Sequence, residues 1–366
     1  MKLLYLSNSI IPSQYANSVH VMKMCQALQQ NDFEAELLCY TQNKNFDENE
    51  VFEKYGIKTK FKIKKFYLRN MRAKFFQKFF SILWMLVNYD KKSLIYGRDV
   101  YGVYLASLLG FDVIYESHGL PTTKLYGMIE NKLLKSKRLK KLVVISEKLK
   151  EIYLENSALK NSEKILVLHD GADALNLSIK GIDLGDGFHI GYIGSLYYEG
   201  RGIDIILEVA KLNHDFTLHL IGGKNEEVNY WKKIATNNVK FYGFLSHNEA
   251  SKYLLSFDVV LMPYQKDLKL ADNKVNTSSW MSPMKMFEYM AAKKAIVSSD
   301  LPVIREVLNE NNSILVQSDN VDDWSKAINK LYKNENLKNR IAEKSYSDFL
   351  NQYSWKERAK NIRSIK

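Results

Sequence analysis

The chain has 366 residues, of which 46% are apolar, and carries a formal net charge of +12. This length favours two domains of ordinary size over one, and the apolar fraction is sufficient for two cores. No stretch approaches the roughly 18 uncharged apolar residues of a membrane span, and the apolar start at 3–6 is too short for a signal peptide, so we expect a cytoplasmic protein.

The chain begins as strand, loop and helix, with an apolar strand predicted over 3–7 and a helix over 18–29. The intervening loop should lie at the carboxyl edge of a sheet, where open α/β sheets bind ligands. Asn17, Ser18 and His20 are therefore candidate ligand-binding residues; the alternative is that Asn17 or Ser18 only caps the helix. The loop lacks the glycines of a dinucleotide fingerprint, which argues against NAD. Cys25 and Cys39 fit buried reduced thiols.

A basic segment follows the second predicted strand, at 34–40. Between 51 and 92 there are twelve lysines and arginines against two acidic residues, interleaved with large apolar side chains at helix-like intervals. Such a segment can lie on an anionic membrane surface, which would suit an enzyme with a lipid-linked acceptor. The alternative is that 79–87 packs into the first domain while its lysines are solvated. A nucleic acid partner is not expected, because no binding module accompanies the charge.

Two further predicted strands end in polar residues. The strand at 93–98 ends in Gly97 and Arg98, and the strand at 112–116 runs into His118 and Gly119. Carboxyl ends of parallel strands share one edge of a sheet, so Arg98 and His118 should face the same cleft. A lone histidine after a strand is, however, more often structural. Strands at 142–145 and 164–168 continue the first sheet.

The stretch 178–187, with three glycines in ten residues, predicts a linker between domains at 1–180 and 181–350. The strand at 189–193 then leads into Gly194, Gly200 and Gly202, which allow the backbone to approach a ligand. Arg201 precedes a helix whose N-terminus can receive phosphate, and its planar fork matches diphosphate oxygens. Strands at 216–221, 239–244 and 258–263 indicate a second parallel sheet, and 265–280 a flexible loop over the sugar site.

The stretch 282–302 predicts an anion site. Ser282 is a suitable N-cap and Pro283 suits the first helical position, so free amides should face a cleft. Lys285 adds a positive charge, and Glu288 a carboxylate about one turn later. Together they suit a sugar nucleotide: amides and lysine for a diphosphate, glutamate for a ribose diol. The alternative is an ordinary amphipathic helix. A buried strand at 295–299 and a helix at 303–308 should follow.

Several motifs in this order resemble family 4 of the retaining glycosyltransferases, which have the GT-B fold. They are Y-x-R at 96–98, Y-E-x-H-G at 115–119, I-S-E-x-L at 145–149, the Gly-x-Asp turn at 171–173, the Arg-Gly pair at 201–202, S-P-x-K-x-F-E-Y-M-A at 282–291 and Y-S-W-K-E-R-A-K-N-I at 353–362. The resemblance implies an α/β chain with two Rossmann-like parallel-sheet domains facing across a cleft. It also implies that 351–366 forms a helix that crosses back to the first domain.

The resemblance further implies site residues. His118, Glu288 and Arg201 are the implied catalytic residues, with His118 near the transferred sugar. The implied acceptor-side residues are Asn17, Ser18, His20 and Arg98. The implied donor-binding set is Gly194, Ser195, Arg201, Gly202, Tyr242, Phe244, Leu245, Ser282, Pro283, Met284, Lys285, Met286 and Glu288. Two positions depart from the family pattern: Trp280 replaces the first of two glutamates, and Ser195 replaces a basic residue.

We expect no metal and no other cofactor, because the chain has no Asp-x-Asp and its seven histidines show no metal-ligand spacing. Arg201, Lys285 and helix amides would then stabilise the leaving nucleotide diphosphate. The expected partners are a UDP- or GDP-sugar donor and a glycan or lipid-linked acceptor at the cytoplasmic membrane face. Two alternatives remain: a nucleotide-sugar-binding protein without turnover, and a basic peripheral membrane scaffold.

Overall fold

The computed structural model describes residues 1–13, 15–69, 73–268 and 276–365. Residues 269–275, which are part of the loop predicted at 265–280, lie outside the described residues. The chain forms two compact units: unit 1 comprises 1–170 and 355–366, and unit 2 comprises 171–354. The structure thus divides the chain after Asp170 and Ser354, where the sequence had suggested 180 and 350. Residues 171–182 belong to unit 2 because they are hydrogen-bonded there: Ala172 N–H donates to Tyr353 O at 3.2 Å, and Ser256 Oγ to Ile182 O at 2.7 Å.

Unit 1 contains a seven-stranded sheet in the order β3-β2-β1-β4-β5-β6-β7, with every pairing parallel. Its strand order reverses between β1 and β4, which places the ligand-binding edge of such a sheet at their carboxyl ends. The sequence had not indicated β3, an edge strand whose exposed lysines made it resemble part of an amphipathic helix. The strands are β1 (Lys2–Ile10), β2 (Glu34–Thr41), β3 (Lys62–Tyr67), β4 (Leu94–Gly97), β5 (Asp112–Ser117), β6 (Leu139–Val144) and β7 (Ile165–Val167).

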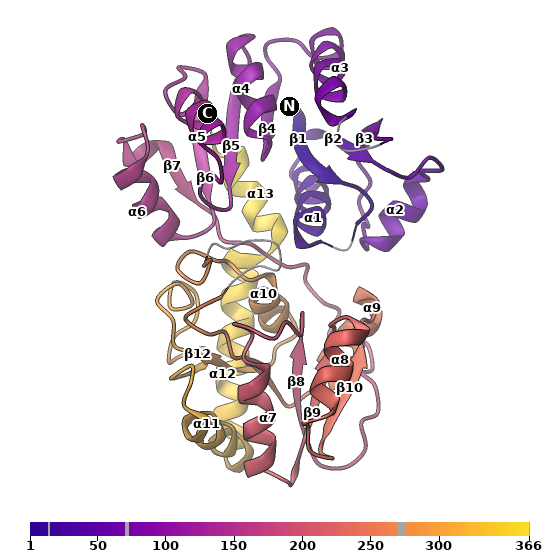
Figure 1. Cartoon of the computed structure of the whole chain (residues 1–366), viewed down its shortest axis with the longest axis vertical. Helices are drawn as coiled ribbons and strands as arrows, with labels where there is room; N and C mark the ends of the chain where they lie inside the picture. The colour runs from indigo at the N-terminus through magenta and orange to yellow at the C-terminus, as the bar shows by residue number, and fades with distance from the viewer. Residues whose placement is uncertain (14, 70–72, 269–275, 366) are drawn as a thin grey trace. The chain divides into compact units, whose positions relative to one another are not determined.

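Helices lie along this sheet (Figure 1), and the C-terminal α13 packs on α1. Trp355 at the start of α13 is buried, as expected for a large apolar side chain. Cys25 and Cys39 are both buried and free, as predicted. The helices are α1 (Ala16–Gln30), α2 (Glu48–Lys54), α3 (Ala73–Asn88), α4 (Val100–Leu108), α5 (Lys124–Leu134), α6 (Glu147–Asn156) and α13 (Trp355–Arg363), with a 3₁₀ turn η1 (Ser162–Lys164).

Unit 2 contains a six-stranded parallel sheet in the order β10-β9-β8-β11-β12-β13, which reverses between β8 and β11. Each predicted strand of this half is present. The strands are β8 (Phe188–Ile193), β9 (Phe216–Ile221), β10 (Val239–Gly243), β11 (Val259–Met262), β12 (Ala295–Ser299) and β13 (Ile314–Val316). The helices are α7 (Ile203–Leu212), α8 (Asn225–Lys232), α9 (His247–Ser256), α10 (Met284–Ala291), α11 (Val321–Lys333) and α12 (Glu335–Asp348), followed by a π-helical turn η2 (Phe349–Tyr353).

The prediction of a helix at 303–308 was wrong, because this stretch is a run of turns. Its apolar residues Val303, Ile304, Val307 and Leu308 are all buried, so their spacing reflects a turn packed on the core of unit 2. None of the described helices of the chain is both long and apolar enough to cross a membrane.

Candidate active site

A buried carboxylate, Glu116, organises the polar residues at the carboxyl ends of the unit 1 strands. It lies near the end of β5 and is 1% exposed. Its Oε1 lies 2.6 Å from His118 Nε2, 2.9 Å from His20 Nε2 and 3.0 Å from Arg358 Nη2. The Tyr96 hydroxyl donates to its other oxygen. One carboxylate therefore joins residues from β4, α1, α13 and the loop after β5.

Arg358 reaches this carboxylate from α13 and is itself buried. Its Nε donates to His169 O at 2.9 Å and its Nη2 to Leu168 O at 3.2 Å, so the guanidinium also holds the chain after β7. Burial alone would raise the pKa of Glu116, but the charges of Arg358 and His20 hold that pKa well below its usual value. Glu116 is consequently an ionised carboxylate paired in the interior.

The two histidines differ in their surroundings. His20 lies between carboxylates, with Nδ1 3.0 Å from Asp170 Oδ1, and its ring makes edge contacts with His118 at 4.7 Å and Trp355 at 5.0 Å between ring centroids. Burial, together with the charge of Arg98, lowers the pKa of His118 to about 4. Burial would raise the pKa of Asp170, but the neighbouring histidines lower it to about 2. His118 is therefore neutral near neutral pH, beside two ionised carboxylates.

The predicted acceptor-side residues divide into two groups. His20 is in the Glu116 cluster, and Arg98 lies close enough to affect His118 electrostatically, with its Nη1 buried and without a hydrogen-bond partner. Ser18 lies elsewhere: its hydroxyl accepts from Tyr55 at 3.0 Å and donates to Tyr15 O at 2.8 Å, at the start of α1. Asn17 is exposed. Tyr15 is the N-cap of α1, so neither Asn17 nor Ser18 has that role.

His20, Glu116 and His118 bring three potential metal-ligand atoms within 4.8 Å of one another. Sequence analysis did not identify this cluster, because His20 lies far along the chain from Glu116 and His118. The Arg358 guanidinium already lies 3.0 Å from the same glutamate oxygen that a metal would use. A divalent cation there would meet this fixed positive charge at contact distance, so the donor set fits an ion-paired network better than a metal site.

The sequence analysis assigned no roles to Glu116, Asp170 and Arg358, although Glu116 and Arg358 lie inside motifs used for the resemblance and Asp170 directly precedes one. The available signal for Glu116 was an ionisable residue after an apolar run, and for Arg358 it was an arginine one helical turn after a tryptophan. Their meeting depends on α13, which is about 240 residues from β5 along the chain.

In unit 2 the predicted donor-binding residues at the β8 and β11 ends form a cationic centre. Lys285, in the first turn of α10, extends along the Tyr192 ring, with Nζ 3.8 Å from the ring centroid. A Cβ added to Gly194 would lie 2.5 Å from this Nζ, so the glycine leaves room for the ammonium group. Burial, together with the charge of Arg201, lowers the pKa of Lys285 well below its usual value, and Glu288 opposes this effect.

Arg201 lies in the loop after β8, immediately before the Gly202 N-cap of α7. Gly202 adopts a φ of 69°, and a Cβ there would lie 1.9 Å from Pro263 O, so only glycine fits. The guanidinium lies 5.6 Å from the rings of both Tyr197 and Tyr264. Its Nε is buried without a hydrogen-bond partner, and among the described residues no acidic group forms an ion pair with Arg201 or Lys285.

The N-terminus of α10 is placed one residue later than predicted. Pro283 is the N-cap, not the first helical residue, because its ψ of 118° is extended, and no side chain caps the helix. Ser282, just before it, is buried. The Tyr289 hydroxyl accepts from Ile193 N–H at 2.8 Å, which fixes α10 to the end of β8. Met284 is half-buried, whereas Met286 is 1% exposed and belongs to the core, so its side chain is not at the site.

The remaining predicted donor-binding residues are less tightly grouped. The Tyr242 hydroxyl is hydrogen-bonded inward to His219 Nδ1 at 2.8 Å, and Leu245 is half-buried, whereas Phe244 is 66% exposed. Ser195 is half-buried and its carbonyl accepts from the Tyr192 hydroxyl at 2.8 Å. Glu288 is half-buried on α10, and Trp280, which departs from the family pattern, is buried.

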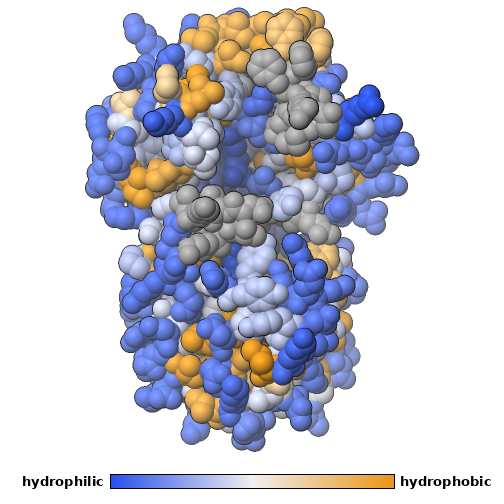
Figure 2. Space-filling model, viewed as in Figure 1, coloured by the Kyte–Doolittle hydropathy of each residue, from blue (hydrophilic) through white to orange (hydrophobic). Residues whose placement is uncertain are grey.

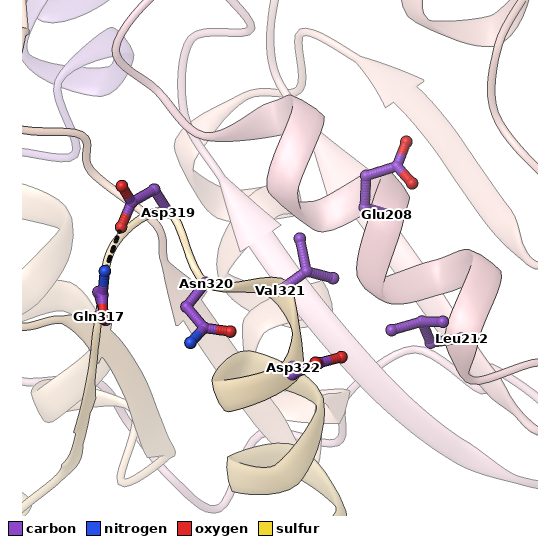
Figure 3. Close-up of a pocket in the computed structure, with 7 residues that line it drawn as sticks. All are labelled: Glu208, Leu212, Gln317, Asp319, Asn320, Val321 and Asp322. Atoms are coloured by element: carbon purple, nitrogen blue, oxygen red, sulfur yellow. Dashed lines mark hydrogen bonds between the residues drawn. The ribbon is translucent and has the colours of Figure 1, made fainter.

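Unit 2 also has a surface pocket of about 450 Å³ beside α7 and the start of α11 (Figure 3). Three of its lining residues are acidic: Glu208, Asp319 and Asp322. Its charge is opposite to that required by a nucleotide diphosphate, and none of the predicted site residues lines it. The pocket is therefore not a candidate for the donor site.

Comparisons with known proteins show what this chain is similar to. Residues 187–334 match the family described as glycosyl transferases group 1. An uncharacterized glycosyltransferase of Methanocaldococcus jannaschii is 22% identical over 278 residues, which cover 69% of this chain and 67% of that protein.

Two solved structures share the fold over nearly the whole chain. A glycosyltransferase from Rickettsia africae has a TM-score of 0.74 at 14% identity and covers 100% of this chain and 97% of its own. Anabaena Alr3699/HepE in complex with UDP has a TM-score of 0.72 at 16% identity and covers 99% of this chain and 98% of its own. With two Rossmann-like domains of the GT-B type, and with residues 187–334 matching the group 1 family, the chain is a glycosyltransferase.

Proposed function

We propose that this glycosyltransferase moves a sugar from a nucleotide-sugar donor to a hydroxyl of a glycan or lipid-linked acceptor. The observation that carries the proposal is the pair Arg201 and Lys285, two cations of unit 2 that are not ion-paired within the described residues. Both side chains are half-buried, and a partly desolvated cation without an acidic partner is unfavourable unless a ligand supplies the anion. A diphosphate does so, and the uncapped start of α10 adds backbone amides to the same anion site.

The proposed reaction retains the anomeric configuration and uses no metal. The bond between the anomeric carbon and the diphosphate oxygen breaks, the acceptor oxygen bonds to that carbon on the same face, and the acceptor proton leaves with the diphosphate. Arg201, Lys285 and the α10 amides stabilise the departing negative charge. Glu288 would bind the ribose, while His118 of unit 1 would contact the reacting substrate. Transfer that continues in excess chelator, with retained configuration in the product, is the expected result.

A UDP- or GDP-sugar is the proposed donor. Support comes from the Anabaena protein, whose structure is described in complex with UDP-glucose. A thermal-shift screen over sugar nucleotides of several bases tests this, since a ligand that binds only the folded state stabilises it according to its concentration over its Kd. Stabilisation by one nucleotide series, followed by release of the nucleoside diphosphate when an acceptor is added, supports the proposal. Binding without release would favour a nucleotide-sugar-binding protein without turnover.

The same protein is proposed to work on an anionic membrane surface, through α3. One face of this helix packs inward through Met85, which is fully buried, while Phe79, Leu83 and Val87 are 62%, 44% and 85% exposed. Figure 2 shows hydrophobic residues gathered at the end of unit 1 that carries α3 and α4. Exposed lysines of β3, including Lys62, lie on an adjacent element and complement anionic headgroups.

Sedimentation with anionic vesicles tests the membrane surface. The double variant Phe79→Ser/Val87→Ser should lose most vesicle binding, whereas Leu212→Ser, at a 56% exposed apolar residue of unit 2, should not. Binding should weaken when neutral vesicles or high salt are used. Vesicle binding that is the same in all three proteins would remove α3 from the proposal. A basic scaffold without enzymatic activity would bind vesicles but no sugar nucleotide.

A further inference from the structure

The ring of His118 is held by a group that can only accept hydrogen bonds. Its Nε2 lies 2.6 Å from Glu116 Oε1, and Arg358 and His20 keep the pKa of this carboxyl well below its usual value, against the effect of burial. An ionised carboxylate has no proton to donate, so the hydrogen of this bond belongs to His118 Nε2. Since a neutral imidazole carries one N–H, Nδ1 is left with a free lone pair.

Glu116 is held rigidly enough to impose this choice. Arg358 Nη2 lies 3.0 Å from the same oxygen, its Nη1 3.5 Å from the other oxygen, and the Tyr96 hydroxyl donates to that second oxygen. The guanidinium is anchored in turn by the carbonyls of Leu168 and His169. All these groups are buried, so the carboxylate has few alternative positions.

The backbone that carries His118 is held as well. Ser117 Oγ donates to Gly119 O at 2.7 Å, and the Tyr153 hydroxyl oxygen lies 2.7 Å from Ser117 Oγ. Both the loop and the ring nitrogen are therefore fixed, from α6 on one side and from α13 on the other. Within the described part of the chain, no residue forms a hydrogen bond with His118 Nδ1.

We infer that Glu116, clamped by Arg358 of the C-terminal helix, is a positioning residue that holds His118 as the Nε2–H tautomer and presents Nδ1 to accept a hydrogen bond from a substrate hydroxyl. The catalytic contact itself rests on the proposed function. The charged and titratable groups that face His118 are Glu116, Asp170, His20, Arg98 and Arg358. Burial lowers the pKa of His118 to about 4, which agrees with a neutral ring over the range where the enzyme would work.

The tautomer can be measured on the wild-type protein without any substrate. Nitrogen-15 NMR of histidine-labelled protein, with the His118→Gln variant used for assignment, should show His118 protonated at Nε2 and unprotonated at Nδ1 at neutral pH. A proton on Nδ1, or a doubly protonated ring, would overturn the inference. This result does not depend on turnover, so it stands apart from the proposed function.

Variants then test the positioning. Glu116→Gln keeps the shape but adds donors, so it should give a mixed His118 tautomer and lower kcat at least about tenfold, with the donor KM within about threefold. Arg358→Lys keeps the positive charge but loses the planar guanidinium that contacts both oxygens of Glu116, and it should show the same changes more weakly. Arg363→Gln removes a cation from the same helix, one that pairs with the exposed Asp32, and should leave both readouts unchanged.

The outcomes separate cleanly. An altered tautomer with reduced kcat in Glu116→Gln supports the inference, and an unaltered tautomer in a folded Glu116→Gln or Arg358→Lys protein contradicts it. If Glu116→Gln does not fold, the wild-type spectrum and Arg358→Lys decide. If the wild-type protein transfers no sugar from any donor while the predicted tautomer is found, the proposed function fails and the positioning of His118 by Glu116 survives.

Discussion

The ionisable centres of the two units are built in opposite ways. In unit 1, Glu116 and Asp170 face Arg358 and His20, so each buried carboxylate has a cationic or titratable partner. In unit 2, Arg201 and Lys285 face tyrosine rings instead of carboxylates. Paired charges in an interior hold side chains in one arrangement, whereas an unpaired charge can still form an ion pair with a ligand of opposite charge. We therefore expect the unit 1 centre to orient side chains and the unit 2 centre to bind an anion.

A second contrast lies within unit 1, between two buried glutamates. Glu116 has a guanidinium partner and its pKa is held low, while Glu130 on α5 receives its hydrogen bonds, among the described residues, from the hydroxyls of Tyr115 and Tyr153, at 2.8 Å each. Burial raises the pKa of Glu130, and the two hydroxyls only partly oppose it. The same side chain at similar burial therefore has opposite electrostatics, which shows that the partner decides the charge state.

The largest effect is expected from breaking the paired centre of unit 1. Arg358→Met leaves Glu116 buried without its guanidinium, which should lower the free energy of unfolding of unit 1 by about 3–5 kcal/mol. Urea unfolding measures this, with Arg363→Gln as the control from the same helix, for which we expect at most about 1 kcal/mol. A loss for Arg358→Met no greater than for Arg363→Gln would contradict the pairing as a source of stability.

The next largest effect is expected from the cations of unit 2. Arg201→Ala removes a charge that would hydrogen-bond the diphosphate, so the Kd of the preferred nucleoside diphosphate should rise by about 10- to 100-fold, while stability without ligand stays nearly constant. Glu288→Ala should weaken binding less. Titration calorimetry measures both. Unaltered binding in the two variants would remove these residues from the donor site.

Lys285 offers a sharper test of the unpaired centre. Because burial holds its pKa well below the usual value, a bound diphosphate should raise that pKa, so proton uptake should accompany binding. Calorimetry in two buffers with different ionisation enthalpies measures the uptake, and Lys285→Met should abolish it. If uptake is the same in wild type and variant, another group is responsible.

The smallest effect should separate the two glutamates by pH. The lowered pKa of Glu116 contributes stability that is present at pH values above the usual glutamate pKa and is lost as the pH falls through the folded pKa. The raised pKa of Glu130 contributes stability that is present below the usual pKa and is lost as the pH rises through the folded pKa. From about pH 4 to about pH 7, Glu116→Gln should therefore become less stable relative to wild type. Over the same range Glu130→Gln should become relatively more stable, because the raised pKa of Glu130 stabilises the wild type only at low pH. Parallel trends in urea unfolding would contradict the assigned charge states.

The sequence by itself determined the strands of both sheets, apart from β3, and it determined the loop chemistry of unit 2. This was possible because buried parallel strands appear as apolar runs, and because Gly202, Arg201 and Lys285 lie in a local loop or at a helix start. The helix expected at 303–308 failed because apolar spacing also arises in a buried turn.

Only the tertiary structure decided the unit 1 centre. Glu116, His20, Asp170 and Arg358 lie on segments with no regular spacing along the chain, and they meet because the sheet brings strand ends together and α13 packs on α1. The charge state of a buried group depends on which partner lies within a few ångströms, and that distance is set by packing between elements, not by neighbours in the chain.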